Sequence, residues 1–205
     1  WESNGSEAGT RRMAAFMAGT ADSYHGGLEK VGNTAFFTAV TPATGHELWK
    51  TDGTPAGTSL VKDIIPGTGS SEISELTAFG GTLFFTAYTA AAGRELWKSD
   101  GTTAGTVMVK DVYPGLNSST VGPVAAANGL VFFIANDGVS GRELWCSDGT
   151  SYGTHLVKDI AEGSANGFAG DPLIAAGNRV YFIANDGTHG AEVWSSDGTA
   201  DGTTM

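Results

Sequence analysis

The five tryptophans of this chain are almost evenly spaced, and this spacing constrains the fold more than any other feature. They lie at positions 1, 49, 97, 145 and 194, so three intervals are 48 residues long and the last is 49. A sustained period of this size is typical of proteins built from copies of one supersecondary unit. The sequence therefore predicts a single repeat domain over residues 1–205. Its units are expected at about 1–48, 49–96, 97–144 and 145–193, with a partial fifth unit at 194–205.

Each unit contains four short runs that are typical of strands. A two-residue turn of Gly or Asn, such as Gly80-Gly81, separates the first run from the second. Such pairs favour tight hairpins because both residue types tolerate a positive φ. The second run carries adjacent aromatic residues, as in Phe84-Phe85, which places apolar groups on both faces of a sheet. The third run contains Glu-Leu-Trp, and the fourth follows an Asp-Gly-Thr turn, as over residues 60–64.

Four antiparallel strands in about 48 residues have the size of one blade of a β-propeller. We therefore predict an all-β fold, a β-propeller built from four-stranded blades. Two arrangements fit the sequence: four blades closed into a ring, or an arc of a larger ring. In the closed ring, residues 9–16 would supply the fourth strand of the last blade. A parallel β-solenoid is the structural alternative, but its shorter coils do not require paired glycine turns.

The block around each tryptophan, Glu-Leu-Trp-x-x-Asp-Gly-Thr, recurs at 47–54, 95–102 and 143–150, and with Val193 in place of Leu at 192–199. It resembles the ELWxxDGT repeats of large bacterial secreted and surface proteins. This resemblance covers the whole chain and implies an extracellular or cell-surface bacterial repeat protein. The turn is also similar to the Asp-box of sialidase-type propellers, although it lacks the spacer of that motif. Because the chain begins at a tryptophan in the middle of a repeat, we expect it to be part of a longer protein.

Charge and composition exclude several classes of partner. The net charge of −11 and the pI near 4.6 argue against nucleic acid and anionic membrane surfaces. The longest apolar run, at about residues 129–135, is far too short to span a bilayer, so no membrane insertion is expected. A single cysteine, Cys146, excludes both an intrachain disulfide and a zinc framework.

The repeated charged residues are interpreted as structural. Glu47, Asp52 and Lys62 recur once per unit, whereas catalysis requires one asymmetric group of residues. We expect Asp52 to accept amides of its own turn and Lys62 to pair with Glu47 on the neighbouring strand. The tryptophans are expected to pack between blades. The chain is therefore predicted not to be an enzyme.

No cofactor and no metal site are predicted. Asp137-Gly138 and Asp186-Gly187 suggest calcium, but neither pair lies in a complete Asp-rich loop, and hairpin turns account for both.

Function is expected on one face of the propeller. In a four-stranded blade, the loop between strands two and three and the connection to the next blade emerge on the same face, and here they vary between units. Binding residues are commonly found on such loops of a rigid scaffold. Loops that vary without any function would look the same in sequence. The candidate ligand-binding residues on this face are Tyr24, His25, Tyr113, Asn117, Phe168, Asp186 and His189.

Aromatic, Asn and Asp side chains suit stacking on a sugar and hydrogen bonding to it. Because the protein is acidic, neutral glycans are the first ligands expected, with other surface proteins as further partners. The predicted function is a non-catalytic binding or adhesion module of a bacterial secreted or cell-surface protein. The alternatives are a structural repeat or assembly subunit, and a propeller domain attached to a secreted polysaccharide-degrading enzyme.

Overall fold

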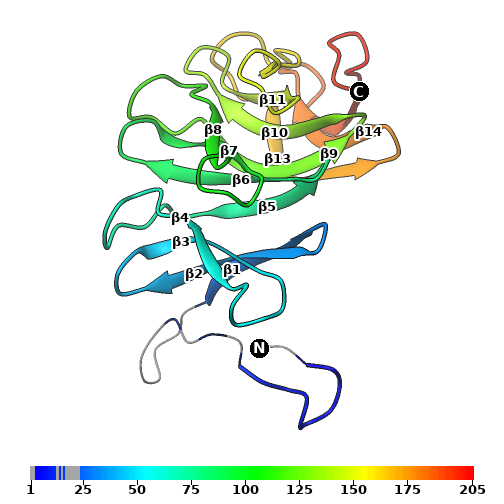
Figure 1. Cartoon of the computed structure of the whole chain (residues 1–205). Coiled ribbons are helices and arrows are strands. Elements are labelled where there is room, and N and C mark those ends of the chain that lie inside the picture. Colours follow the sequence, from blue (N-terminus) through cyan, green and yellow to red (C-terminus); the bar gives the residue numbers. More distant parts are fainter. Residues whose placement is uncertain (1–2, 13, 15, 17–23) are drawn as a thin grey trace.

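The computed structural model describes residues 3–12, 14, 16 and 24–205. The described part of the chain contains strands and turns, arranged as four antiparallel sheets (Figure 1). Among these residues there is no helix that is long and apolar enough to cross a membrane. The prediction of an all-β fold of repeated antiparallel sheets is therefore confirmed.

Each sheet is a meander whose strands follow chain order. The first sheet consists of β1 (Tyr24–Val31), β2 (Thr34–Thr41), β3 (Gly45–Thr51) and β4 (Ser59–Lys62). The second consists of β5 (Ser74–Phe79), β6 (Thr82–Thr89), β7 (Gly93–Ser99) and β8 (Val107–Lys110). The third consists of β9 (Thr120–Ala127), β10 (Leu130–Asn136), β11 (Arg142–Ser147) and β12 (His155–Leu156). The fourth consists of β13 (Phe168–Ala176), β14 (Arg179–Asn185) and β15 (Ala191–Ser196).

The predicted hairpin turns between the first two strands are present in all four sheets. In the second and third sheets both central residues have positive φ: 58° and 78° at Gly80 and Gly81, and 51° and 78° at Asn128 and Gly129. Turns of this kind match the twist of the paired strands, which explains why Gly and Asn recur at this point of the repeat.

The adjacent aromatic residues of each second strand lie on opposite faces of the sheet. In the second sheet Phe85 pairs with Trp97 across β6 and β7, and this face packs against the first sheet. Phe84 and Leu96 point the other way and form a core with the third sheet. We call the side with Phe84 and Leu96, and the equivalent side of each sheet, the leading face. The side with Phe85 and Trp97, and its equivalents, is the trailing face.

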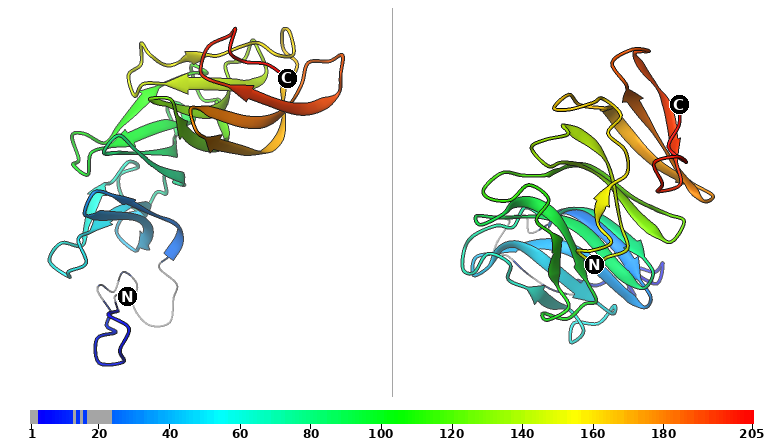
Figure 2. Two further views of the ribbon diagram at one scale, coloured as in Figure 1. Left: turned by 90° about the vertical axis from the view of Figure 1, so that its right-hand side faces the viewer. Right: turned by 90° about the horizontal axis from the view of Figure 1, so that it is seen from above.

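The four sheets form an open arc. They follow one another in chain order, and the innermost strands β1, β5, β9 and β13 lie side by side in succession (Figure 2). Residues 3–12 lie beyond the first sheet, at the opposite end of the array from β15 (Figure 1). Thr204 bridges Ser195 at the free side of β15, which is the place predicted for residues 9–16. Of the two arrangements that the sequence left open, the structure has the arc and not the closed four-bladed ring.

In the first three sheets the fourth strand is shorter than the sequence predicted. β4 ends at Lys62 rather than at Ile64, and β12 contains only two residues. The reason is the buried side chain of Glu47, whose carboxylate accepts the backbone N–H groups of Ile64 (3.1 Å) and Ile65 (3.3 Å). These amides bond to a side chain instead of to the neighbouring strand, so the backbone leaves the sheet after Lys62.

Candidate functional site

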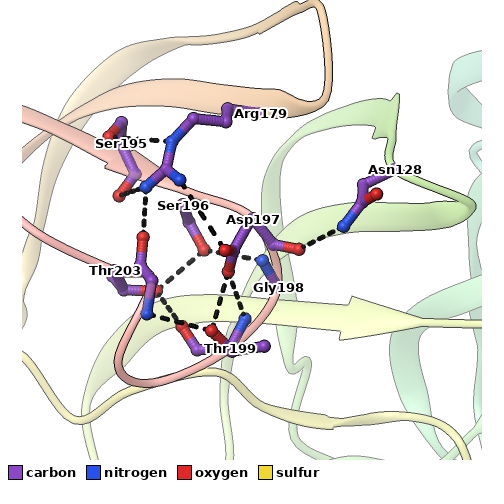
Figure 3. A network of polar contacts seen from close by, with 9 residues as sticks. Asn128, Arg179, Ser195, Ser196, Asp197, Gly198, Thr199 and Thr203 are labelled. Carbon is purple, nitrogen blue, oxygen red and sulfur yellow. Dashed lines mark hydrogen bonds and ion pairs between the residues drawn. The ribbon is translucent and has the colours of Figure 1, made fainter.

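Each repeated Asp closes its own turn, as predicted. Asp52 Oδ1 accepts the backbone N–H (2.9 Å) and the hydroxyl (2.7 Å) of Thr54, and these bonds hold the pKa of Asp52 below its usual value. The Thr54 hydroxyl oxygen in turn accepts the N–H of Gly57 at 2.9 Å. Figure 3 shows the same network around Asp197 and Thr199, where Arg179 also joins the turn.

The geometry of this turn, which recurs in each unit, also explains why its second glycine recurs. A Cβ added to Gly57 would lie 2.0 Å from Asp52 Oδ1, so no larger residue fits while the carboxylate holds the turn. The imperfect copy at the start of the chain folds in the same way. Asn4 replaces Asp and Ser6 replaces Thr, and Asn4 Oδ1 accepts the N–H (3.0 Å) and the hydroxyl (2.7 Å) of Ser6.

The lysine of the fourth strand does not pair with the glutamate of the third, and this prediction was wrong. Lys62 Nζ donates to the carbonyl oxygen of Thr106 in the next sheet at 2.7 Å and lies 6.0 Å from the centre of the Trp97 ring. The register explains the difference. Lys62 is paired with Leu48, whose side chain lies on the leading face, so the lysine also points toward the next sheet. Lys110 and Lys158 make the equivalent contacts with the third and fourth sheets.

We call the packed interface between two successive sheets a joint. In each of the first two sheets a second lysine also bonds across the joint to the next sheet. Lys50 Nζ donates to the carbonyl oxygen of Gly101, and Lys98 Nζ donates to that of Gly149, both at 2.7 Å. Cys146 has the corresponding position in the third sheet, with its Sγ 3.9 Å from the carbonyl oxygen of Gly198. Burial raises the pKa of the Cys146 thiol to about 11, which makes it a poor nucleophile near neutral pH.

The glutamate of each Glu-Leu-Trp block is fully buried in the first three sheets. Glu95 accepts the N–H of Val112 and the hydroxyl of Ser119, and Glu143 accepts the N–H groups of Ala161 (3.2 Å) and Gly167 (2.8 Å). Burial raises the pKa of Glu47, Glu95 and Glu143 to about 7, against the opposing effect of these hydrogen bonds. Each glutamate thus anchors the connection that leads to the next sheet.

The loops between the second and third strands and the connections between successive sheets vary from unit to unit and lie on one face. We call this face the loop face. Tyr113, on the connection from the second sheet to the third, lies against the loop between β10 and β11. A Cβ added to Gly138 in that loop would come within 2.6 Å of its ring. Asn117 is exposed, and its backbone carbonyl lies against Gly93 at the start of β7. The connections between sheets therefore lie against the loops between the second and third strands. Both emerge on the same side of a four-stranded meander.

Asp186 and His189 form an exposed polar pair on this face. Asp186 Oδ1 accepts the N–H groups of Thr188 and His189, both at 2.8 Å, and its Oδ2 lies 2.7 Å from His189 Nδ1. The hydrogen bond from the His189 side chain is the largest cause of the low pKa of Asp186, about 2. The imidazole is more than half exposed, so it is presented to solvent by a loop that its partner Asp holds in place.

Asp137 organises the equivalent loop of the third sheet by accepting the N–H groups of Val139 and Ser140. The aspartates that suggested calcium therefore bond to their own loops. Among the described residues, no group of three or more His, Cys, Asp or Glu side chains is arranged to hold a metal ion.

Phe168 does not belong to the surface predicted for it. It lies in β13, is buried in the core and stacks on Phe182 with ring centres 6.4 Å apart. Its position after a polar connection suggested a loop, but the strand begins at this residue. The side chains of Tyr24 and His25, also predicted for the site, lie outside the part of the chain whose side chains are described.

A recurring basic position on this face was not among the residues predicted for the site. The residue before each Glu-Leu-Trp block is His46, Arg94 or Arg142 in the first three units, and this recurrence was the available signal. The Arg94 guanidinium forms an ion pair with Glu72 at 2.8 Å, and Arg142 lies 5.7 Å from the centre of the Phe168 ring. Arg94 thus ties a connection to the third strand β7, and Arg142 ties the third strand β11 to the start of β13.

No family model matches the sequence, and no curated protein matches it. Two solved structures of the propeller type are similar in fold. The crystal structure of a puromycin hydrolase mutant complexed with PGG shares 20% sequence identity at a TM-score of 0.56, over 85% of this chain and 27% of the other. A Bacteroides ovatus protein, Xyloglucan PUL GH43B, shares 13% identity at a TM-score of 0.42, over 86% of this chain and 40% of the other. At 20% identity the likeness to the first of these structures concerns the fold alone, which is that of a propeller arc.

Proposed function

We propose that this chain is a non-catalytic binding module of a bacterial secreted or cell-surface protein, and that it binds neutral glycans through the loop face. One observation carries the proposal. The Asp, Glu and Lys residues that recur in each unit hold turns, connections and joints, whereas the exposed polar groups of the loop face differ from one unit to the next. A distinctive site in an array of copied units requires such differences.

The recurring acids support a binding role over a catalytic one. Glu47, Glu95 and Glu143 have the raised pKa values expected of a general acid, about 7. However, all three are fully buried and bond to backbone amides of their own connections, so a substrate has no access to them.

The chemistry of the loop face supports a neutral, hydroxyl-rich ligand. Asn117 and His189 are exposed, and amide and imidazole side chains can both donate hydrogen bonds to hydroxyl groups and accept them. Tyr113 adds part of an aromatic ring to the same face. With a net charge of −11, the protein repels anionic polysaccharides at long range. The resemblance to ELWxxDGT repeats supports placing the ligand outside a bacterial cell.

The proposal is tested by titrating neutral oligosaccharides into the protein and into single variants. Asn117→Ala and His189→Ala should weaken binding, each by about tenfold or more if a hydrogen bond is lost from a formed complex. Tyr152→Ala is the control because Tyr152 is fully exposed in the repeated turn on the opposite face. The proposal fails if no neutral glycan binds, or if the control variant loses binding while both loop variants retain it.

A further inference from the structure

Each inner joint of the array is built by one leading face and one trailing face. On the leading faces, Phe36, Phe84 and Phe132 are exposed by 2%, 4% and 0%. The leucines of the Glu-Leu-Trp blocks, Leu48, Leu96 and Leu144, are exposed by at most 1%. Three joints with the same residues at the same positions show what kind of surface a leading face binds: the trailing face of another sheet of this repeat.

The fourth sheet has the same leading face, but it is uncovered. Tyr181 and Val193 have the positions of Phe132 and Leu144, and they are 39% and 61% exposed. Ile174, opposite Tyr181 on β13, is 52% exposed. Three large apolar side chains thus lie together on one sheet face, and such a patch marks an interaction site.

We propose that this leading face of β13, β14 and β15 binds the first sheet of a second copy of the chain, head to tail. The complementary surface is present at the other end of the array. Leu28, paired with Phe37 on the trailing face of the first sheet, is 70% exposed. Its counterpart in the second sheet, Leu76, packs into the joint between the first and second sheets.

Phe16 completes the complementary surface. Its ring lies 4.7 Å from that of Trp49 and 5.7 Å from that of Phe37, between centres. Counted from the turn motif, Phe16 has the place of Ile64, which packs in the joint between the first two sheets. The first sheet therefore already carries one strand end of the blade that would precede it. The fourth sheet, which has three strands and the Thr204 bridge, supplies the rest of such a blade.

The two surfaces lie at opposite ends of the arc (Figures 1 and 2), so they meet between molecules and not within one. A head-to-tail contact of this kind uses different surfaces on the two partners and produces rings or open chains. Both lysine ties found in the first two inner joints are missing from it. Ser195 has the place of Lys50, and Ala14 has the place of Lys62. We therefore expect a reversible association rather than a permanent one.

Sedimentation velocity over a range of concentrations tests the proposal with the full chain. The unmodified protein should form oligomers whose fraction grows with concentration. Val193→Asp should weaken this association by more than about tenfold, because a charge would be buried in the joint. The matched control is Val139→Asp, since Val139 is 71% exposed on the loop between β10 and β11, away from this face. Val193→Ser repeats the test without a charge, and circular dichroism verifies that each variant is folded.

A mixing experiment distinguishes the head-to-tail arrangement from pairing of two leading faces. Leu28→Glu blocks the trailing end and leaves the leading end intact. Val193→Asp and Leu28→Glu should each be monomeric alone, and an equimolar mixture should form a heterodimer but no larger species. A chain that stays monomeric at every concentration overturns the proposal. Self-association of Leu28→Glu as strong as that of the unmodified protein, or a loss in Val139→Asp as large as in Val193→Asp, also overturns it.

Discussion

Lys62 Nζ lies 6.0 Å from the centre of the Trp97 ring while it donates a hydrogen bond to Thr106 in the same sheet as that tryptophan. The Lys62 side chain thus contacts both the repeated tryptophan and the last residue of the repeated turn in the next sheet. The contact links the fourth strand of one sheet to the third strand of the next. Because it recurs at Lys110 and Lys158, it identifies the lysine as a tie between sheets and explains its presence in successive units.

Replacing one such lysine should weaken a joint. Lys110→Met keeps most of the aliphatic chain and removes the hydrogen bond to Thr154 and the cation over Trp145. We expect the free energy of unfolding to fall by about 1–2 kcal/mol. Urea denaturation gives this value, with Lys30→Met as the control because Lys30 is exposed on β1. Equal losses in the two variants would contradict a specific role for Lys110.

The repeated tryptophans should be essential to folding. Trp97 is buried in the core between the first and second sheets, and its ring stacks on Phe85 with centres 6.5 Å apart. Trp97→Ala should lower the free energy of unfolding by about 3–5 kcal/mol. Thermal and urea denaturation measure the loss against Tyr152→Ala, which removes a fully exposed ring. Unchanged stability of Trp97→Ala would show that the indole packs less tightly than its burial indicates.

The Asp and the second Gly of each turn should depend on each other. Gly105→Ala brings a Cβ to 2.1 Å from Asp100 Oδ1, so the carboxylate must give up its bonds to Thr102. This substitution should cost about 1–3 kcal/mol of unfolding free energy. In a background of Asp100→Ala the same substitution should cost much less, because the clashing group is gone. A double-mutant cycle measures the difference, and strict additivity would disprove the coupling.

Stability should have a maximum in mildly acidic solution. The pKa of each of Glu47, Glu95 and Glu143 rises from 4.5 to about 7 in the folded state, so this state binds protons more tightly than the unfolded chain. The resulting stabilisation is complete below pH 4.5 and is lost as the pH rises toward 7. It is on the order of 3 kcal/mol for each glutamate. The turn aspartates have lowered pKa values, so their contribution is lost as the pH falls below 3.8.

Urea denaturation between pH 4 and pH 8 tests this prediction. In Glu143→Gln the free energy of unfolding should fall less steeply above pH 4.5 than in the unmodified protein, because an amide does not titrate. Glu162→Gln is the matched control, since Glu162 is exposed on the connection that Glu143 anchors. If stability instead rises from pH 5 to pH 7, the buried glutamates are ionised throughout and their hydrogen bonds outweigh the cost of burial.

Features that depend on neighbouring residues could be predicted from the sequence alone. The hairpin at Gly80-Gly81 follows from the φ values that glycine permits. The Asp52 turn follows from hydrogen bonds that span two residues. The alternation of Phe84 and Phe85 between two faces follows from the pleat of a strand. Repetition of these local signals was sufficient to predict an array of four-stranded sheets, and it also placed the loops that vary on one face.

Features that depend on how the sheets stack were decided only by the tertiary structure. Lys62 bonds to a residue 44 positions away, and its direction depends on a register with Leu48 that sequence spacing does not reveal. Phe168 is buried because β13 begins there and packs on β14. The two ends of the array lie apart, which is visible only in the stacked sheets (Figure 2). The exposure of Tyr181 and Val193 on the leading face of the fourth sheet also emerges only from the stacking, because a short-range pattern in the sequence does not report which face another sheet covers.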